Sequence, residues 1–235
     1  GLAVQSIAAF DTALWDLKAR RAGLPLAKLL GAHRDAVPCY NTSGGYLQAP
    51  IEEVIERAEA SRARGIGGIK LKAGQPDRRA DLRRVAALRR HFGDEVALMV
   101  DVNQQWDRTT AARMGRALEE FDLTWIEEPL APEDRAGYRR CAHHMTTPLG
   151  AGESLGSIGA FRDLLADEAV SIVQPDISVC GGFTGFSRIA ALIEAHGLPV
   201  LPHAFGGIVN FQASLHMAAT RAPSRSASPL RYPLI

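Results

Sequence analysis

Short runs rich in β-forming residues alternate with longer segments of helical periodicity along most of this chain. Such alternation with short connections predicts a parallel sheet built from βα units. The expected strands are 37–44, 67–72, 96–103, 123–129, 148–154, 170–176 and 198–204. Their number and spacing favour an α/β fold of the (β/α)8-barrel type over an open doubly wound sheet. No GxGxxG motif follows the first strand, so a dinucleotide-binding fold has no support.

Helical patterns fill the intervals between these strands. The segment 50–65 carries apolar residues at helical spacing and ends at a glycine. Further helices are expected at 76–93, 109–121, 132–145, 157–167, 183–196 and 207–219. The segment 6–31 precedes the first strand, and we expect it to pack outside the barrel. The tail is rich in Pro and Ser, and it stops where an eighth strand is expected to begin or to be under way.

The composition argues against several classes of function. Lys and Arg number 27 against 26 Asp and Glu, so the net charge of +1 gives no reason to expect attraction to nucleic acid or a membrane surface. No apolar stretch approaches the roughly 18 residues that a membrane span requires. Three cysteines without a CxxC pair predict reduced thiols rather than a disulfide framework. We therefore expect a cytoplasmic globular protein with no nucleic-acid partner and no membrane partner.

Ionisable and polar residues stand at the C-terminal ends of successive expected strands, where barrel enzymes carry their catalytic groups. They are Lys70, Lys72, Asp101, Asn103, Glu127, Glu128, Glu153, Asp176 and His203. Any one of them alone would be read as a cap or a turn residue. Burying so many charges together costs too much free energy unless they pair or hold a metal ion. The pattern therefore predicts a functional site at this edge.

Three of these residues form an all-oxygen set on adjacent strands, namely Asp101, Glu127 and Glu153. Hard oxygen ligands without Cys or His favour Mg²⁺, with water and substrate completing the coordination. The alternative is that these carboxylates only form salt bridges with the neighbouring lysines. Three acids around one centre suit a divalent ion better, so the sequence favours the metal. Two tryptophans nearby, Trp106 and Trp125, could border the site or pack in the core, and core packing is favoured.

Short motifs at the strand ends resemble those of a known family. The segments IKLK, DVNQQW, WIEEPL, GAGES, QPDISVCGG and PHAFG occur in this order. They resemble the enolase superfamily and, within it, the mandelate racemase subgroup, over a match that runs from about Ala8 to the end of the chain. The resemblance implies a (β/α)8-type barrel with only a remnant of an α+β capping domain. Residues 1–36 would be the linker and helix from the end of that domain, and 37–235 the catalytic barrel domain, lacking its last strand or ending within it.

The resemblance also implies roles for the residues at the strand ends. The metal ligands would be the three acids named above. Lys72 would be the general base on one face of the substrate, and His203, oriented by Asp176, would be the acid or base on the other. Lys70 would contact the substrate carboxylate, and Asn103 would bind substrate or support the metal ligands. An Asp on strand six, rather than the Lys of the muconate and dipeptide-epimerase branches, favours the branch with an Asp–His pair.

Elementary electrostatics gives a reason for the two lysines of IKLK. Period-two alternation in a strand directs both ammonium groups to the same side. A general base must titrate near neutral pH, and an isolated lysine does not. We expect Lys70 and the metal ion to disfavour protonation of Lys72, which lowers the pKa of Lys72.

The implied reaction is abstraction of the proton α to a carboxylate of a small-molecule substrate, in a homo-oligomeric enzyme. The favoured hypothesis is Mg²⁺-dependent dehydration of a sugar acid, an aldonate or aldarate, to a 2-keto-3-deoxy acid through an enediolate. Racemisation or epimerisation of a 2-hydroxy acid is the alternative within this chemistry. A non-catalytic barrel remnant acting as a binding module is the alternative from another class. Two features support the binding module: most of the capping domain is missing, and the tail has no Glu for strand eight. Either Arg231 occupies the position of that Glu, or the chain stops just short of it.

Overall fold

The computed structural model describes residues 1–32, 34–42 and 46–221, which belong to two compact units. The sheet unit contains Cys39–Ala151 and Asp167–Ser171. The terminal unit contains Gly1–Pro38, Gly152–Ala166 and the chain from Ile172 onward. The expected eighth strand and Arg231 lie outside the described residues.

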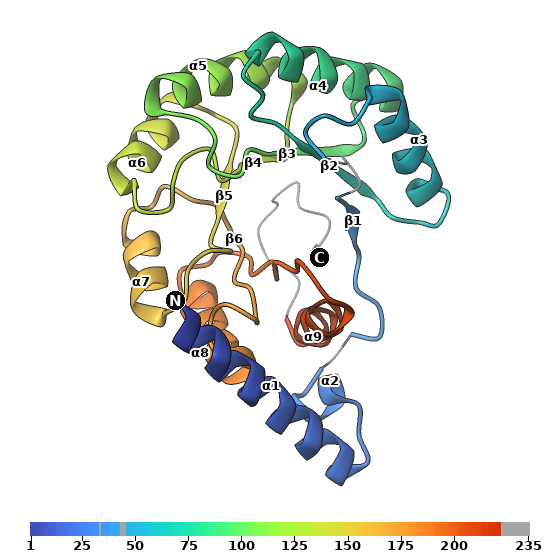
Figure 1. Cartoon of the computed structure of the whole chain (residues 1–235), viewed down its shortest axis with the longest axis vertical. Helices are drawn as coiled ribbons and strands as arrows, with labels where there is room; N and C mark the ends of the chain where they lie inside the picture. The colour runs from blue at the N-terminus through green and yellow to red at the C-terminus, as the bar shows by residue number, and fades with distance from the viewer. Residues whose placement is uncertain (33, 43–45, 222–235) are drawn as a thin grey trace. The chain divides into compact units, whose positions relative to one another are not determined.

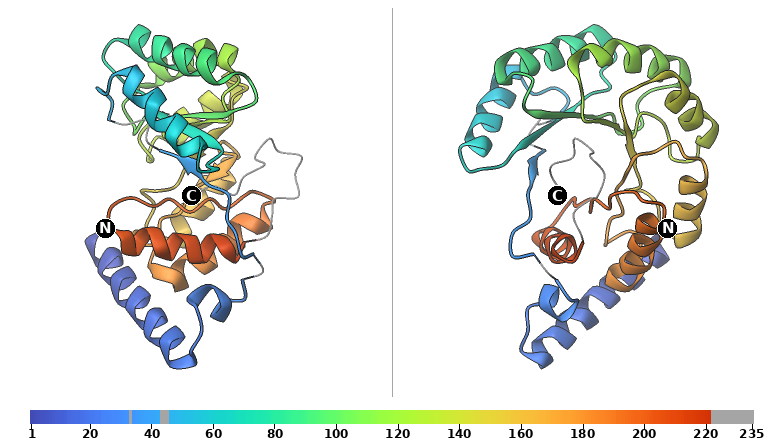
Figure 2. Two further views of the ribbon diagram at one scale, coloured as in Figure 1. Left: turned by 90° about the vertical axis from the view of Figure 1, so that its right-hand side faces the viewer. Right: turned by 180° about the vertical axis from the view of Figure 1, so that it is seen from behind.

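The sheet unit consists of parallel strands in chain order, each followed by a helix or a turn on the way to the next. The strands are β1 (Tyr40–Asn41), β2 (Gly68–Lys72), β3 (Ala97–Asp101), β4 (Trp125–Glu127) and β5 (Leu149–Ala151). The helices are α3 (Ile51–Arg62), α4 (Arg78–Phe92), α5 (Arg108–Leu118), the 3-10 helix η1 (Glu119–Phe121) and α6 (Arg135–His144). Helices α3 to α6 lie along one side of the strands, as the view from behind also shows (Figures 1 and 2).

Aspartate caps fix where the helices of this unit begin. Asp77, Asp107 and Asp134 each accept a hydrogen bond from a backbone N–H in the first turn of α4, α5 and α6. An N-cap carboxylate satisfies one of the donors that the first turn leaves open. Each of these aspartates therefore marks the point where the loop after β2, β3 or β4 ends and the next helix begins.

The register of the strands brings their carboxyl ends level with one another. Lys72 is the partner of Asp101 between β2 and β3, and Asp101 is the partner of Glu127 between β3 and β4. Ile69 and Leu71, which alternate with the two lysines along β2, are buried. The alternation places apolar side chains on one face of β2 and the lysines on the other.

The terminal unit is mainly helical. It contains α1 (Leu2–Ala22), α2 (Leu26–Leu29), α7 (Ile158–Ala166), β6 (Ile172–Val173), α8 (Gly182–Ala195) and α9 (Ile208–Ala219). Helix α1 packs along α8. Their contact includes a hydrogen bond from the indole of Trp15 to Thr184 Oγ1 at 3.0 Å and another from Thr184 N to Asp11 at 3.0 Å. None of the described helices is both long enough and apolar enough to cross a membrane.

The strand expected at 198–204 is reduced to two isolated parallel bridges. Val173 pairs with Val200, and Asp176 pairs with His203. Pro175 and Pro202 lie between these bridges, and proline has no N–H to donate to a ladder. The backbone still runs alongside, because His203 N donates to Pro175 O at 3.1 Å. His203 and Asp176 are therefore held side by side without a continuous strand.

Candidate active site

Both lysines of β2 reach the carboxylate of Asp101 on β3. Lys72 Nζ lies 2.6 Å from Asp101 Oδ2, and Lys70 Nζ lies 3.5 Å from the same oxygen. Lys70 also forms an ion pair with Glu127 on β4. The side chains of Lys70, Asp101 and Glu127 are no more than 5% exposed. The carboxyl ends of three neighbouring strands thus form one buried cluster of charges.

Burial and ion pairing oppose each other at this cluster, and pairing prevails. Burial acts to lower the pKa of Lys70, but attraction to Glu127, Tyr40 and Asp101 outweighs it and raises that pKa well above its usual range. Burial acts to raise the pKa of Asp101, but Lys70 and Lys72 hold it below its usual value. Lys70 is therefore a fixed cation, which suits the contact with an anionic group more than the role of a base.

Trp125 belongs to this cluster as well as to the core. Its side chain is buried, its ring meets Tyr40 edge-on at 5.5 Å, and its Nε1 donates to Glu127 Oε2 at 2.9 Å. Of the two places that the sequence left open for Trp125, the favoured one in the core and the alternative beside the candidate site, its side chain occupies both. The available signal was its position two residues before Glu127 in one strand, which puts both side chains on the same face.

The loops after β3 and β4 contain non-glycine residues in the left-handed region. Asn103 has φ 46°, Gln104 has φ 66° and Glu128 has φ 39°. Asn103 Oδ1 accepts a hydrogen bond of 2.6 Å from Lys72, and Gln104 Nε2 donates to Glu128 Oε2 at 2.8 Å. Backbone in this region costs free energy, and it persists where surrounding contacts determine it. The loops are held together, and Asn103 faces the base expected at Lys72.

The terminal unit holds the remaining residues expected at the site. His203 Nδ1 lies 2.7 Å from Asp176 Oδ2, and His203 Nε2 lies 3.2 Å from Glu153 Oε2. Burial acts to raise the pKa of Asp176, but hydrogen bonds from His203 and Ser178 lower it below its usual value. An ionised Asp176 can only accept, so Nδ1 of His203 carries the proton and Nε2 faces Glu153.

Glu153 follows β5 through a glycine that no other residue could replace without strain. Gly152 has φ 135°, and a Cβ there would lie 3.0 Å from Gln174 N and 3.1 Å from the ring of Phe161. A side chain is rarely found at such a φ. The segment GAGES therefore turns at Gly152 in a way that requires glycine and places Glu153 directly after the strand.

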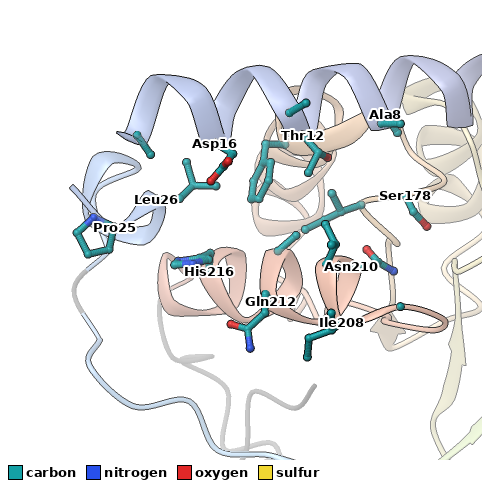
Figure 3. A pocket seen from close by; sticks show the side chains of 18 of the residues that line it. Ala8, Thr12, Asp16, Pro25, Leu26, Ser178, Ile208, Asn210, Gln212 and His216 are labelled. Carbon is teal, nitrogen blue, oxygen red and sulfur yellow. The ribbon is translucent and has the colours of Figure 1, made fainter. Parts of the chain in front are cut away.

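A large groove lies on the terminal unit between α1 and α9 (Figure 3). Its volume is about 890 Å³, and its walls include Ala8 and Thr12 of α1 and His216 of α9. Ser178 and Asn210 also line it. Both of these residues donate hydrogen bonds to the carboxylate of Asp176.

The expected site residues thus fall into two groups. The sheet unit holds Lys70, Lys72, Asp101, Asn103 and Glu127, which form one network. The terminal unit holds Glu153, Asp176 and His203, which form another. Sequence reasoning missed Gln104, Ser178 and Asn210. Ser178 carried a signal, its place two residues after Asp176, whereas Asn210 carried none.

Parallel βα units with lysines and carboxylates at the carboxyl ends of their strands are the mark of barrel enzymes. A family model described as "Enolase C-terminal domain-like" matches residues 53–233, and the "Mandelate racemase / muconate lactonizing enzyme, N-terminal domain" model matches residues 2–31. The chain belongs to this enolase superfamily, in its mandelate racemase and muconate lactonizing enzyme branch. The expected family is confirmed.

Several curated relatives are sugar-acid enzymes. The chain is 51% identical over 219 residues to the L-talarate/galactarate dehydratase of Salmonella typhimurium, covering 93% of this chain and 54% of that protein. It is 41% identical to the 3,6-anhydro-alpha-L-galactonate cycloisomerase of Streptomyces coelicolor, covering 86% of this chain and 56% of that protein. The chain therefore spans about half the length of the curated relatives it matches.

Solved structures show the same fold. The crystal structure of the L-talarate dehydratase from Polaromonas, complexed with Mg and L-glucarate, matches with a TM-score of 0.87 at 51% identity. That match covers 95% of this chain and 61% of the Polaromonas chain. The fold class expected from the sequence, α/β of the (β/α)8-barrel type, is confirmed.

Proposed function

We propose that the protein is a Mg²⁺-dependent enzyme that removes the proton α to the carboxylate of a sugar acid and dehydrates it. The observation that carries this proposal is the network at the ends of β2, β3 and β4, in which Lys70, Asp101 and Glu127 are buried and Lys72 is partly exposed. Relatives named as dehydratases of talarate, galactarate and arabinonate support the choice of a sugar acid. The product would be a 2-keto-3-deoxy acid.

The residues present fit a magnesium ion. Asp101 and Glu127 are buried carboxylates at register-paired positions of neighbouring strands, and Glu153 follows the next strand in the sheet unit by two residues. All three offer oxygen, the ligand type that Mg²⁺ prefers. We propose that these three carboxylates hold the ion. When bound, Mg²⁺ supplies positive charge that stabilises the developing enediolate.

The protein side chains have separate tasks in this proposal. Lys72 takes the proton from the carbon α to the carboxylate, while Lys70 remains a cation beside the substrate carboxylate. Asn103 accepts from Lys72 at 2.6 Å and orients its amine. His203, with Nδ1–H held by Asp176, would act as the doubly protonated imidazolium and deliver the proton on Nε2 to the departing 3-hydroxyl group. The electrons of the broken C–H bond form the double bond as water leaves.

Racemisation or epimerisation is the second candidate. A crystal structure described as a racemase from Streptomyces coelicolor, with bound magnesium, matches this chain with a TM-score of 0.89 at 38% identity. In that reaction Lys72 and His203 would each exchange a proton with the same carbon. The third reading, a binding module without turnover, predicts magnesium or acid binding alone.

Metal binding is tested first, by calorimetry with Mg²⁺ on the full-length protein. Glu153→Gln should lower the affinity for Mg²⁺ at least about tenfold, because it removes a charged ligand. Glu128→Gln is the matched control, since Glu128 neighbours Glu127 but is held by Gln104. Equal affinities in the two variants would remove Glu153 from the ligand set.

Turnover is tested with a panel of aldonic and aldaric acids in the presence of Mg²⁺, with a chelator as control. Formation of a 2-keto-3-deoxy acid that stops with the chelator supports the proposal. Interconversion of C2 epimers without loss of water would support the racemase instead. Binding of Mg²⁺ without conversion of any acid would leave the binding module.

A further inference from the structure

The carboxylate of Asp176 receives donors from three directions besides His203. Ser178 donates to Oδ1 through its backbone N at 2.7 Å and its Oγ at 2.5 Å. Asn210 Nδ2 lies 3.2 Å from Oδ1 and 3.2 Å from Oδ2. The amide of Asn210 therefore spans both oxygens, including the one that receives His203 Nδ1.

The orientation of the Asn210 amide follows from chemistry. An ionised carboxylate only accepts, so the side that faces Asp176 must be the NH₂ group. The opposite atom, Oδ1, is buried and has no hydrogen-bond partner among the described residues. Leaving an acceptor buried and unpaired costs free energy. The amide keeps this unfavourable arrangement because its donor is engaged by Asp176.

Helix α9 ties this amide to the backbone of the histidine. Asn210 lies in the first turn of α9, where its backbone N donates to Gly207 O at 3.1 Å. Ser214, one turn further, donates from Oγ to His203 O at 3.4 Å. Figure 3 shows Asn210 on the ribbon of α9 and Ser178 on a separate segment near it. One helix thus contacts both members of the Asp176–His203 pair.

We propose that Asn210 is a positioning residue that holds the Asp176 carboxylate so that His203 keeps its proton on Nδ1 and presents Nε2 to the substrate. This inference rests on the proposed function of His203 in proton transfer. Without the amide, Ser178 would hold only Oδ1 and, among the described residues, His203 alone would contact Oδ2, so the carboxylate and the ring could turn together. Neutral His203 would then sample both tautomers, because Glu153 Oε2 lies 3.2 Å from Nε2 and can accept from a proton held there. The fraction whose Nε2 is free to take up the proton that it later delivers would fall.

The test is nitrogen NMR of the full-length protein labelled at histidine, at a pH where the ring is neutral. The unmodified protein should show one tautomer of His203, protonated at Nδ1. Asn210→Ala should give a mixture, whereas Asn210→Ser, which retains a short donor, should shift back toward the single tautomer. Gln212→Ala is the control, because Gln212 lies on the same helix and lines the same groove without contacting Asp176.

Kinetics give the second readout. Asn210→Ala should lower kcat for the reaction that uses His203 by roughly tenfold or more with little change in KM, since a positioning group acts on the bound state. A His203 that keeps a single Nδ1–H tautomer in Asn210→Ala overturns the inference, whatever the activity. If the unmodified protein turns over no acid, the proposed function fails while the tautomer experiment still decides the role of Asn210. Asn210→Leu replaces Asn210→Ala if the latter does not fold.

Discussion

The indole Nε1 of Trp125 lies 2.9 Å from Oε2 of Glu127, two residues further along β4. Lys70 engages the other oxygen of the same carboxylate. Glu127 is completely buried, so neither contact is exchanged for water. The rotamer of Glu127 is consequently fixed before any ion arrives, which is what a partner behind a metal ligand achieves.

The first prediction follows from this contact. Trp125→Phe keeps a large aromatic ring in the core but removes the donor to Glu127. We expect the affinity for Mg²⁺, measured by calorimetry, to fall about tenfold or more. Trp106→Phe is the control, because Trp106 is also buried and its Nε1 has no hydrogen-bond partner in the described part of the chain. Similar affinities for both variants would show that Trp125 acts only through packing.

The second prediction concerns the buried lysine. Lys70→Met leaves Asp101 and Glu127 without their closest shared cation, and an unpaired buried charge typically costs about 3–5 kcal/mol. Urea unfolding without metal should show a loss of this order. Lys28→Met is the control, because the pair of Lys28 with Asp35 is largely exposed and is expected to contribute about 0–1 kcal/mol. If Lys70→Met loses no more unfolding free energy than Lys28→Met, the ion pairs of Lys70 do not stabilise the buried network.

The third prediction separates the two proton-transfer groups. If Lys72 and His203 act on opposite faces of the substrate, Lys72→Ala should abolish deuterium exchange from one C2 configuration and spare the other. His203→Asn should do the reverse. A base contributes roughly two to four decades in rate, so deuterium incorporation into the full-length protein's substrate will reveal the loss. Should both variants lose exchange of the same configuration, one residue serves only in binding or electrostatics.

The fourth prediction tests packing in the terminal unit. A Cβ on Gly185 would overlap the carbonyl oxygen of Cys180 and would lie 3.0 Å from its carbonyl carbon. Because backbone atoms cannot move aside as a flexible side chain does, Gly185→Ala should cost about 3 kcal/mol or more. Gly159→Ala in α7 is the control, where the nearest atom is Ser157 Oγ at 3.9 Å and the exchange should be neutral or stabilising by up to about 1 kcal/mol. Thermal unfolding measures both, and an equal effect would contradict the overlap.

The strands of the sheet unit were predictable because their signals are local. Period-two alternation in 67–72 gives both the strand and the shared side of Lys70 and Lys72, and β2 occupies Gly68–Lys72. The strand expected at 198–204 was less predictable. The apolar residues there favour a strand, whereas Pro202 interrupts the ladder of backbone hydrogen bonds, so only isolated bridges form. The helix expected at 109–121 is present as α5 followed by η1, and it ends for a local reason, the left-handed Asp122.

The supporting residues of the site were harder to predict than the residues that they support. Asn210 is 34 residues from Asp176 and stands on a helix, where an amide is ordinarily a surface residue. No spacing rule connects a position on α9 with a strand end. Trp125 was found as a large apolar residue, but its hydrogen bond depends on the rotamer of Glu127. These two hydrogen bonds depend on how distant parts of the chain pack and on side-chain rotamers, which the sequence pattern does not give.

The left-handed residues after β3 and β4 have a consequence for how this protein can change. Glycine at Gln104 would relax the backbone, yet it would also delete the amide that holds Glu128. Searches for thermostable variants should therefore enrich glycine at 104 and asparagine at 128, because both residues adopt the left-handed backbone at a lower cost in free energy. At these two positions the strained backbone and the hydrogen bond between Gln104 and Glu128 occur together, so relieving the first means losing the second.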